Sequence, residues 1–186
     1  ETVNVLVAAG TFTDAVSNTN SVSNTFDWTY DTADPTMTIT STAGTSDGAT
    51  SAVEAFALTF TSNEATSNFV VGDITATGGD GCTLAGFGAS GGSTTVYVAT
   101  CTPDNDGETV NVLVAAGAFS DAAGNTNTVS NTFDWTWDGT GPTMTITSTA
   151  GTADGGSSNV EAFALTFTSN EATSDFVVGD ITATGT

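Results

Sequence analysis

Short runs of alternating apolar and polar residues make up most of the chain, and clusters of Gly, Asn, Asp and Ser separate them. Met37 and Ile39 share one face of such a run, and Phe56, Leu58 and Phe60 alternate in the next. A period of two residues is typical of a half-buried strand, because successive side chains point to opposite faces. The pattern predicts seven strands and no helix in the middle of the chain. Their ranges are 36–42, 54–61, 68–77, 82–87, 94–101, 108–115 and 128–137.

Seven short strands joined by polar turns indicate an all-β fold, an immunoglobulin-like β-sandwich. Its expected core includes the apolar face of the strands over 108–115 and 128–137, namely Val110, Val112, Val114, Phe133, Trp135 and Trp137. The strand over 68–77 holds the apolar residues Phe69, Val71 and Ile74. For the two tryptophans we expect packing in the core and at its rim.

The sequence also repeats itself at a distance of 107 residues. Residues 1–79 align without a gap with residues 108–186, and about four positions in five are identical. Near-identical tandem copies predict a linear array of stacked sandwiches, because a spacer gains length with every copy whereas an enzyme gains little. Pro35 and Pro142 favour unit boundaries, since proline resists pairing into a strand.

The predicted division has three parts. Residues 35–141 form one complete unit, 1–34 are the last two strands of a preceding unit, and 142–186 are the first three strands of a following one. Two arrangements supply the remaining strands: one much longer polypeptide, or separate subunits that complete one another head to tail in the manner of donor-strand pairing.

The charge balance excludes several functions. The chain has 21 Asp and Glu residues, no Lys, Arg or His, and a formal net charge of −21. It therefore lacks a basic surface for nucleic acid or anionic lipid, a histidine for acid–base catalysis and an arginine for phosphate. No apolar run reaches the roughly 18 residues of a membrane span. We expect no enzymatic activity, no nucleic-acid binding and no membrane insertion.

Cys82 and Cys101 fall in the stretch that occurs once. The turn between them predicts a hairpin, and pairing Phe87 with Val96 also places the two cysteines opposite each other. A cross-strand disulfide fits this register and an oxidising, extracellular compartment. Two buried thiols in a strand pair are the alternative.

The run VLVAAGAFSDAAGNTNTVSNTF and the following linker GPTMTITS resemble the bacterial immunoglobulin-like repeats of giant surface adhesins. The resemblance extends over the whole chain, and the turn DAAGN at Asp121–Asn125 is its most specific element. It implies an extracellular extender domain, often stiffened by calcium at its junctions. The first copy departs from it, reading DAVSN at Asp14–Asn18, without the turn glycine.

The strand order predicts where the acidic loops meet. Alternate loops of a sandwich lie at opposite ends, so the first end should gather Asp31, Asp34, Glu64, Asp121 and Asn125. At the next junction, Asp138 should meet Glu171. Oxygen ligands without His or thiolate favour Ca²⁺ over zinc or copper. The alternative is that these acids are solvated turn residues.

The sequence thus predicts a structural extracellular filament or stalk that associates with itself and carries calcium at its junctions. A binding module of another class is the alternative, an adhesin that recognises glycans or another surface elsewhere in the full-length protein. Extender domains repeat whereas binding tips usually do not, and this favours the structural role.

Overall fold

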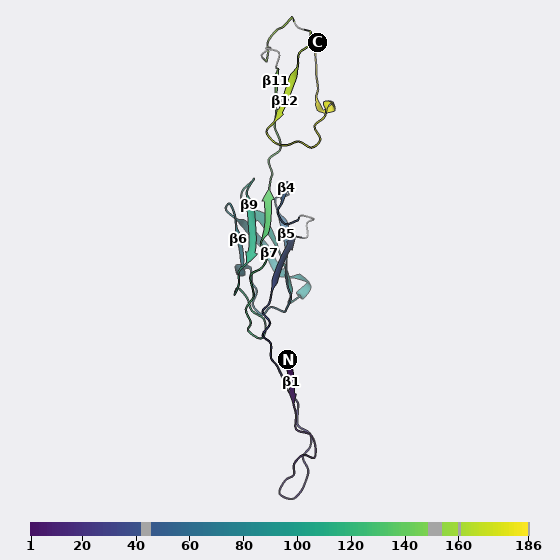
Figure 1. Cartoon of the computed structure of the whole chain (residues 1–186), viewed down its shortest axis with the longest axis vertical. Helices are drawn as coiled ribbons and strands as arrows, with labels where there is room; N and C mark the ends of the chain where they lie inside the picture. Colours follow the sequence, from purple (N-terminus) through teal and green to yellow (C-terminus); the bar gives the residue numbers. More distant parts are fainter. Residues whose placement is uncertain (42–45, 149–153, 160, 186) are drawn as a thin grey trace. The chain divides into compact units, whose positions relative to one another are not determined.

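The computed structural model describes residues 1–41, 46–148, 154–159 and 161–185. The ordered elements in these ranges are twelve β-strands and three short 3₁₀ turns, so the predicted all-β class is confirmed. The chain divides into two compact units, Glu1–Asp138 and Gly139–Thr186 (Figure 1). The predicted parts 1–34, 35–141 and 142–186 remain a prediction about a longer array.

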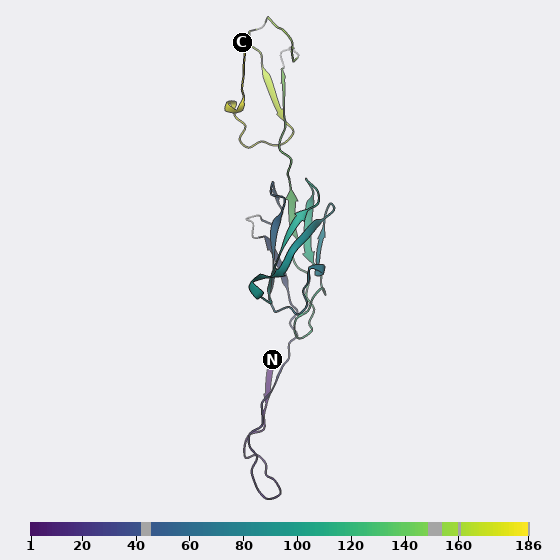
Figure 2. The same ribbon diagram turned by 180° about the vertical axis from the view of Figure 1, so that it is seen from behind.

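Two four-stranded sheets face each other in the part of the first unit that follows β2, and Figures 1 and 2 show the two layers from opposite sides. We call the eight strands β3–β10 the central sandwich. One sheet has the order β3-β5-β8-β7, with strands Met37–Ser41, Phe56–Ser62, Val96–Pro103 and Cys82–Ala89. The other has the order β4-β10-β9-β6, with strands Ala49–Ser51, Phe133–Trp137, Thr109–Val114 and Ile74–Thr77.

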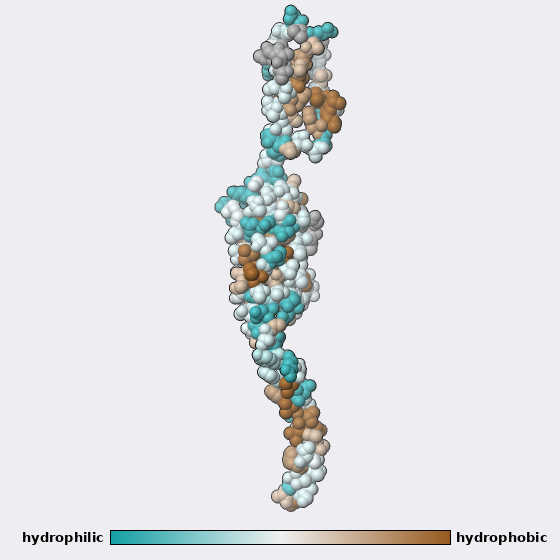
Figure 3. Space-filling model, viewed as in Figure 1, coloured by the Kyte–Doolittle hydropathy of each residue, from teal (hydrophilic) through white to brown (hydrophobic). Residues whose placement is uncertain are grey.

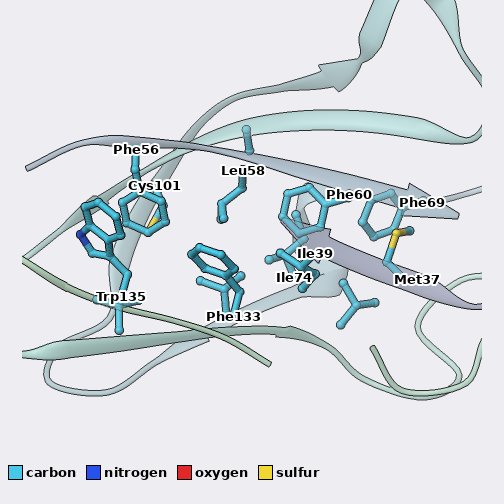
Figure 4. Packing of buried hydrophobic residues seen from close by; sticks show 14 of the residues in the cluster. Met37, Ile39, Phe56, Leu58, Phe60, Phe69, Ile74, Cys101, Phe133 and Trp135 are labelled. Carbon is cyan, nitrogen blue, oxygen red and sulfur yellow. The ribbon is translucent and has the colours of Figure 1, made fainter. Parts of the chain in front are cut away.

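The core lies between the two sheets and follows the predicted alternation. Phe56, Leu58 and Phe60 of β5 are at most 1% exposed, whereas the intervening residues are more accessible. Trp135 is fully buried and stacks on Phe56 with 4.3 Å between ring centroids (Figure 4). Trp137 is half-buried at the rim, as predicted. Contacts between aromatic rings of opposite sheets therefore hold the layers together.

The strand predicted over 68–77 is shorter than expected. The Asp73 carboxylate accepts the backbone N–H of Val70 at 2.8 Å and closes a 3₁₀ turn, η1 (Val71–Asp73), before β6 begins at Ile74. Val71, predicted to lie within the strand, lies in this turn and is 43% exposed, whereas Phe69 and Ile74 are buried.

Besides the seven predicted strands, the central sandwich contains an eighth, β4, which pairs in parallel with β10. Two hydrogen bonds set this pairing: Gly48 donates its N–H to the Asp134 carbonyl at 2.8 Å, and the Asp134 N–H donates to the Asp47 carboxylate at 2.7 Å. The strand predicted from 128 begins only at Phe133. Before it, the Asn131 side chain bonds both the N–H and the carbonyl of Ile39, at 2.8 and 3.0 Å. An amide side chain thus joins the two sheets where a strand was expected.

A disulfide joins Cys82 to Cys101 within the β7–β8 hairpin, with 5.7 Å between their Cα atoms. The predicted register was wrong, because Cys82 pairs with Pro103 and Cys101 with Leu84. The disulfide therefore links diagonal neighbours. A bulge between Ala85 and Gly88 shifts the pairing, and Gly86 takes a positive φ of 65° within it. Glycine permits this backbone conformation without steric cost.

Each flanking segment holds one two-stranded sheet. In the first unit, β1 (Thr2–Val5) pairs antiparallel with β2 (Phe26–Thr29). In the second unit, β11 (Met144–Ser148) pairs antiparallel with β12 (Leu165–Ser169), and the turn η3 (Val178–Asp180) follows. The large apolar side chains of both segments are exposed and appear as brown patches in Figure 3. A two-stranded sheet has no second layer to cover its apolar face.

Candidate metal site

Three carboxylates from separate loops meet in the first unit. Asp31 lies in the segment before β3, Glu64 follows β5, and Asp121 lies between β9 and β10. One carboxylate oxygen from each lies within 4.8 Å of the other two. Within the ranges that the structure describes, this is the one group of three or more acidic or other metal-ligating side chains that is this close. We call it the acidic trio.

The turn Asp121–Asn125 fixes the most buried member. The Oδ1 atom of Asp121 accepts the backbone N–H groups of Gly124 at 2.7 Å and Asn125 at 2.9 Å. Its Oδ2 atom accepts the side-chain amide of Asn125 at 2.9 Å. This hydrogen bond from the Asn125 side chain is the largest effect on the pKa of Asp121 and lowers it below its ordinary value. Desolvation opposes the shift, and the backbone hydrogen bonds add to it. Asp121 is 5% exposed and carries its negative charge at neutral pH.

Asn125 also reaches the first member of the trio. Its side-chain nitrogen donates to the backbone carbonyl of Asp31 at 3.2 Å. The carboxylate of Asp31 in turn accepts the N–H of Ala33 at 3.1 Å, which orders the turn before Pro35. Pro35 is fully buried, and its carbonyl accepts the N–H of Thr128 at 3.0 Å. The segment before β3 is therefore attached to the loop that carries Asp121.

Asn63 positions Glu64 at the end of β5. Its Oδ1 atom accepts the Thr36 N–H at 2.6 Å, and its side-chain nitrogen donates to Glu64 Oε1 at 3.2 Å. The same loop is held against the loop of Asp121, because Ser67 donates its N–H to the Ser120 carbonyl at 2.9 Å. Sequence reasoning missed Asn63. Asn170 bonds the following glutamate in the same way, but most positions recur between the copies, so the recurrence did not single out Asn63.

The remaining predicted ligands have different positions. Asp34 is exposed and outside the acidic trio, and the second copy has Gly141 in its place. Asp138 and Glu171 belong to the two separate units, so their meeting stays a prediction. Glu171 nevertheless accepts a 3.0 Å bond from Asn170, the bond that Asn63 gives to Glu64 in the first unit.

The first copy keeps the geometry of the Asp121 turn without its glycine. Asp14 accepts the N–H groups of Val16 and Asn18 at 2.9 Å, and the Asn18 side chain at 2.9 Å. Ser17 stands where the second copy has Gly124 and has a φ of 70°, the one positive φ of a non-glycine residue in the described ranges. The N–H of Ser17 donates to the Asp14 backbone carbonyl at 3.1 Å, and the carboxylate bonds of Asp14 to the residues on either side keep the serine in this strained conformation.

The acidic trio suits a hard divalent cation. Calcium binds oxygens at about 2.3–2.6 Å, so two ligands on opposite sides of one ion lie about 4.6–5.2 Å apart. Three oxygens spaced evenly round the ion lie about 4.0–4.5 Å apart. The oxygen atoms of the acidic trio, within 4.8 Å of one another, are therefore close to the spacing that one shared ion requires. The chain has no Lys, Arg or His to neutralise these carboxylates. A cation from the solvent is the remaining source of positive charge apart from the chain's amino terminus.

A family model described as a bacterial Ig-like domain matches residues 31–136. The matched range covers the central sandwich up to its last residue but one and includes all three residues of the acidic trio. Neither the comparison with curated proteins nor the comparison with solved structures gave a match. No helix within the described ranges is long and apolar enough to cross a membrane.

Proposed function

Because the chain belongs to the bacterial Ig-like domain family, whose members are commonly surface or extracellular structural modules, we propose that it is a spacer unit of an extracellular filament or stalk. In this role the tandem copies provide length, and calcium at the acidic trio stiffens the segment before each sandwich. The family is typically non-enzymatic, which agrees with a chain that lacks His, Lys and Arg.

The acidic trio is the observation that supports calcium most directly. Three loops that are distant in sequence bring their carboxylates together, and amide side chains rather than cations hold them there. Like charges repel at this distance, and a shared counter-ion would remove this repulsion. An ion bound by both Asp31 and the loops of the sandwich would restrict the motion of the segment before β3.

Thermal unfolding with calcium, magnesium or a chelator tests the proposal. Extracellular calcium modules bind with dissociation constants of about 10⁻⁴–10⁻³ M. At about 10 mM calcium, binding to the folded state adds about 1.4–2.7 kcal/mol to the free energy of unfolding. We expect a higher melting temperature in calcium than in chelator and a smaller effect of magnesium, whose shorter bonds require tighter octahedral geometry.

Glu64→Gln is the informative variant, because it removes one carboxylate and leaves the turn of Asp121 intact. Its matched control is Glu54→Gln, the same change at an exposed site outside the acidic trio. We expect Glu64→Gln to lose at least about tenfold in calcium affinity by titration calorimetry, and Glu54→Gln to bind like the parent chain. Equal calcium responses of both variants, or no response of the parent chain, would contradict the proposal.

A further inference from the structure

The two flanking segments expose side chains that their copies bury in the central sandwich. Val5 is 57% exposed in the first segment, whereas its copy Val112 is fully buried. Ile146 is 58% exposed in the second unit, whereas its copy Ile39 is 2% exposed. The same contrast holds for Trp28 with Trp135 and for Leu165 with Leu58. Both segments therefore present an apolar face, and the corresponding face of the other sequence copy is buried inside the central sandwich.

The central sandwich shows what covers each face. Its residues 108–137 correspond to 1–30, its residues 36–77 correspond to 143–184, and these two parts pack against each other. Phe56 from the second part stacks on Trp135 from the first, as Figure 4 shows. Across one sheet, β6 pairs antiparallel with β9, with Ile74 opposite Val114. The two flanking segments are thus the two halves of a second sandwich core.

We propose that the N-terminal segment 1–34 of one copy of this chain packs on the C-terminal segment 142–186 of a second copy and builds a composite sandwich. The contacts of the central sandwich carry over by the offset of 107 residues. Phe163 of one copy then stacks on Trp28 of the other, and Asn24 bonds the backbone of Ile146 as Asn131 bonds Ile39. Ile181 lies opposite Val7, as Ile74 lies opposite Val114.

The identity of the core residues supports a second copy as the partner. Every buried apolar residue of the central sandwich that has a counterpart in the flanking segments is identical there, and the differences between copies fall on other positions. The two without a counterpart, Ala99 and Cys101, belong to β8. The composite sandwich therefore lacks the β7–β8 hairpin and is open along β12, which makes it weaker than the central one.

This contact joins different surfaces of two copies, so it leaves one free face at each end of the pair. Heterologous contacts of this kind extend into a ring or a filament. The composite sandwich also brings Asp14, the copy of Asp121, toward Glu171, the copy of Glu64. That consequence rests on the proposed function and predicts that calcium strengthens the association. The packing of the apolar faces does not depend on it.

Sedimentation velocity of the 186-residue chain between about 5 and 500 µM, in calcium and in chelator, tests the inference. Val5→Asp disrupts the N-terminal face, and its matched control is Val22→Asp, because Val22 is 59% exposed and its copy Val129 is also 61% exposed. Ile146→Asp disrupts the C-terminal face. Its control is Val177→Asp, since Val177 is 57% exposed and its copy Val70 is 54% exposed.

The parent chain should form larger species as its concentration rises. Val5→Asp and Ile146→Asp should each weaken this association at least about tenfold, because each buries a charge in an apolar contact. Both controls should associate within about twofold of the parent. An equimolar mixture of Val5→Asp and Ile146→Asp should form a one-to-one dimer and stop there, since the two intact faces are on different chains. Circular dichroism melts verify that the central sandwich of each variant stays folded.

A parent chain that stays monomeric over this range would overturn the inference. So would an equal loss of association in test and control variants, which would indicate non-specific apolar contact, or a mixture that fails to form the dimer. Self-association of Val5→Asp alone at the strength of the parent would also overturn it, because two C-terminal faces would then be pairing. If chelator leaves the association unchanged, the result supports the composite sandwich. It then contradicts only the proposed calcium ion at the Asp14–Glu171 contact.

Discussion

The disulfide between Cys82 and Cys101 should contribute a large part of the stability of the central sandwich. It ties β7, the edge strand of its sheet, to β8, which lies inside that sheet. Apart from its pairing with β8, this edge strand contributes only half-buried side chains such as Leu84 and Phe87 to the core. Cys101 itself is fully buried against the core, near Phe56 (Figure 4). Reduction leaves both side chains in place and removes the covalent constraint.

The sequence separation sets the expected magnitude. The cysteines are 19 residues apart, and the loop-closure entropy that the bond removes from the unfolded chain corresponds to about 3 kcal/mol. For a domain of this size, a loss of 3 kcal/mol lowers the melting temperature by roughly 10–20 °C. The effect acts on the unfolded state, so the native far-ultraviolet circular dichroism spectrum should change little at low temperature.

Thermal melts with and without a phosphine reductant measure the difference, and a thiol count confirms that reduction is complete. The double variant Cys82→Ala/Cys101→Ala is the control: it should melt close to the reduced parent chain and should not respond to reductant. A fully reduced parent chain that melts within about 2 °C of the oxidised one would refute the reasoning, because the expected entropic cost would then be absent.

Two further predictions concern the turn of Asp121. Gly124 has a φ of 95° and no atom within 4 Å of an added Cβ, so Gly124→Ser should cost about 1–2 kcal/mol of unfolding free energy through backbone strain alone, measured by urea denaturation; an unchanged midpoint would contradict this. Because the folded pKa of Asp121 is lowered, its ionised form stabilises the fold above the ordinary value of 3.8, and this contribution is lost as pH falls through the lower folded value. Asp121→Asn should therefore be less stable than the parent at pH 7, and the gap should narrow below about pH 4; a gap independent of pH would show that the carboxylate charge does not matter.

Alternation predicted most of the fold because burial on one face imposes a period of two on each long strand. The residues of β5 and β9 show this clearly, since Phe56, Leu58 and Phe60 are buried as expected, and so are Val110, Val112 and Val114. The short strand β4 could not be predicted in this way. Its three residues, Ala49–Ser51, bury no large apolar side chain, and hydrogen bonds to Asp134 from a distant part of the sequence position it.

The hairpin register was wrong because the turn lies further along the chain than predicted. Beside the turn η2 (Ser90–Gly92), Gly88 pairs with Val98 and Ala89 with Tyr97, so the pairing of Phe87 with Val96 is already excluded there. The bulge between Ala85 and Gly88 then changes the offset by one residue. Gly86 and Gly88 marked the site, because glycine within a strand often indicates a bulge. The alternation in that strand is too weak to fix the register, since residues on both faces of β7 are exposed.

The acidic trio was accessible to prediction because strand order alone assigns loops to the two ends of a sandwich. Asp31, Glu64 and Asp121 follow from that rule. Asp34 was assigned by its closeness to Asp31 in sequence, and the rule cannot tell which of two neighbouring linker acids points toward the loops. The supporting role of Asn63 depends on a side-chain bond across the linker, which no periodicity reveals.

Neutral amides take the place that ion pairs have in other proteins. Asn127 is 3% exposed, accepts the Phe119 N–H at 2.8 Å and donates to the carbonyls of Ala115 and Thr128, also at 2.8 Å. Its copy Asn20 makes the corresponding bonds in the first segment. Such bonds lose little to salt or pH, because neither partner is charged. A chain without cations can thus order its long loops with asparagine, and we therefore place the dependence on calcium at the acidic trio and not in the core.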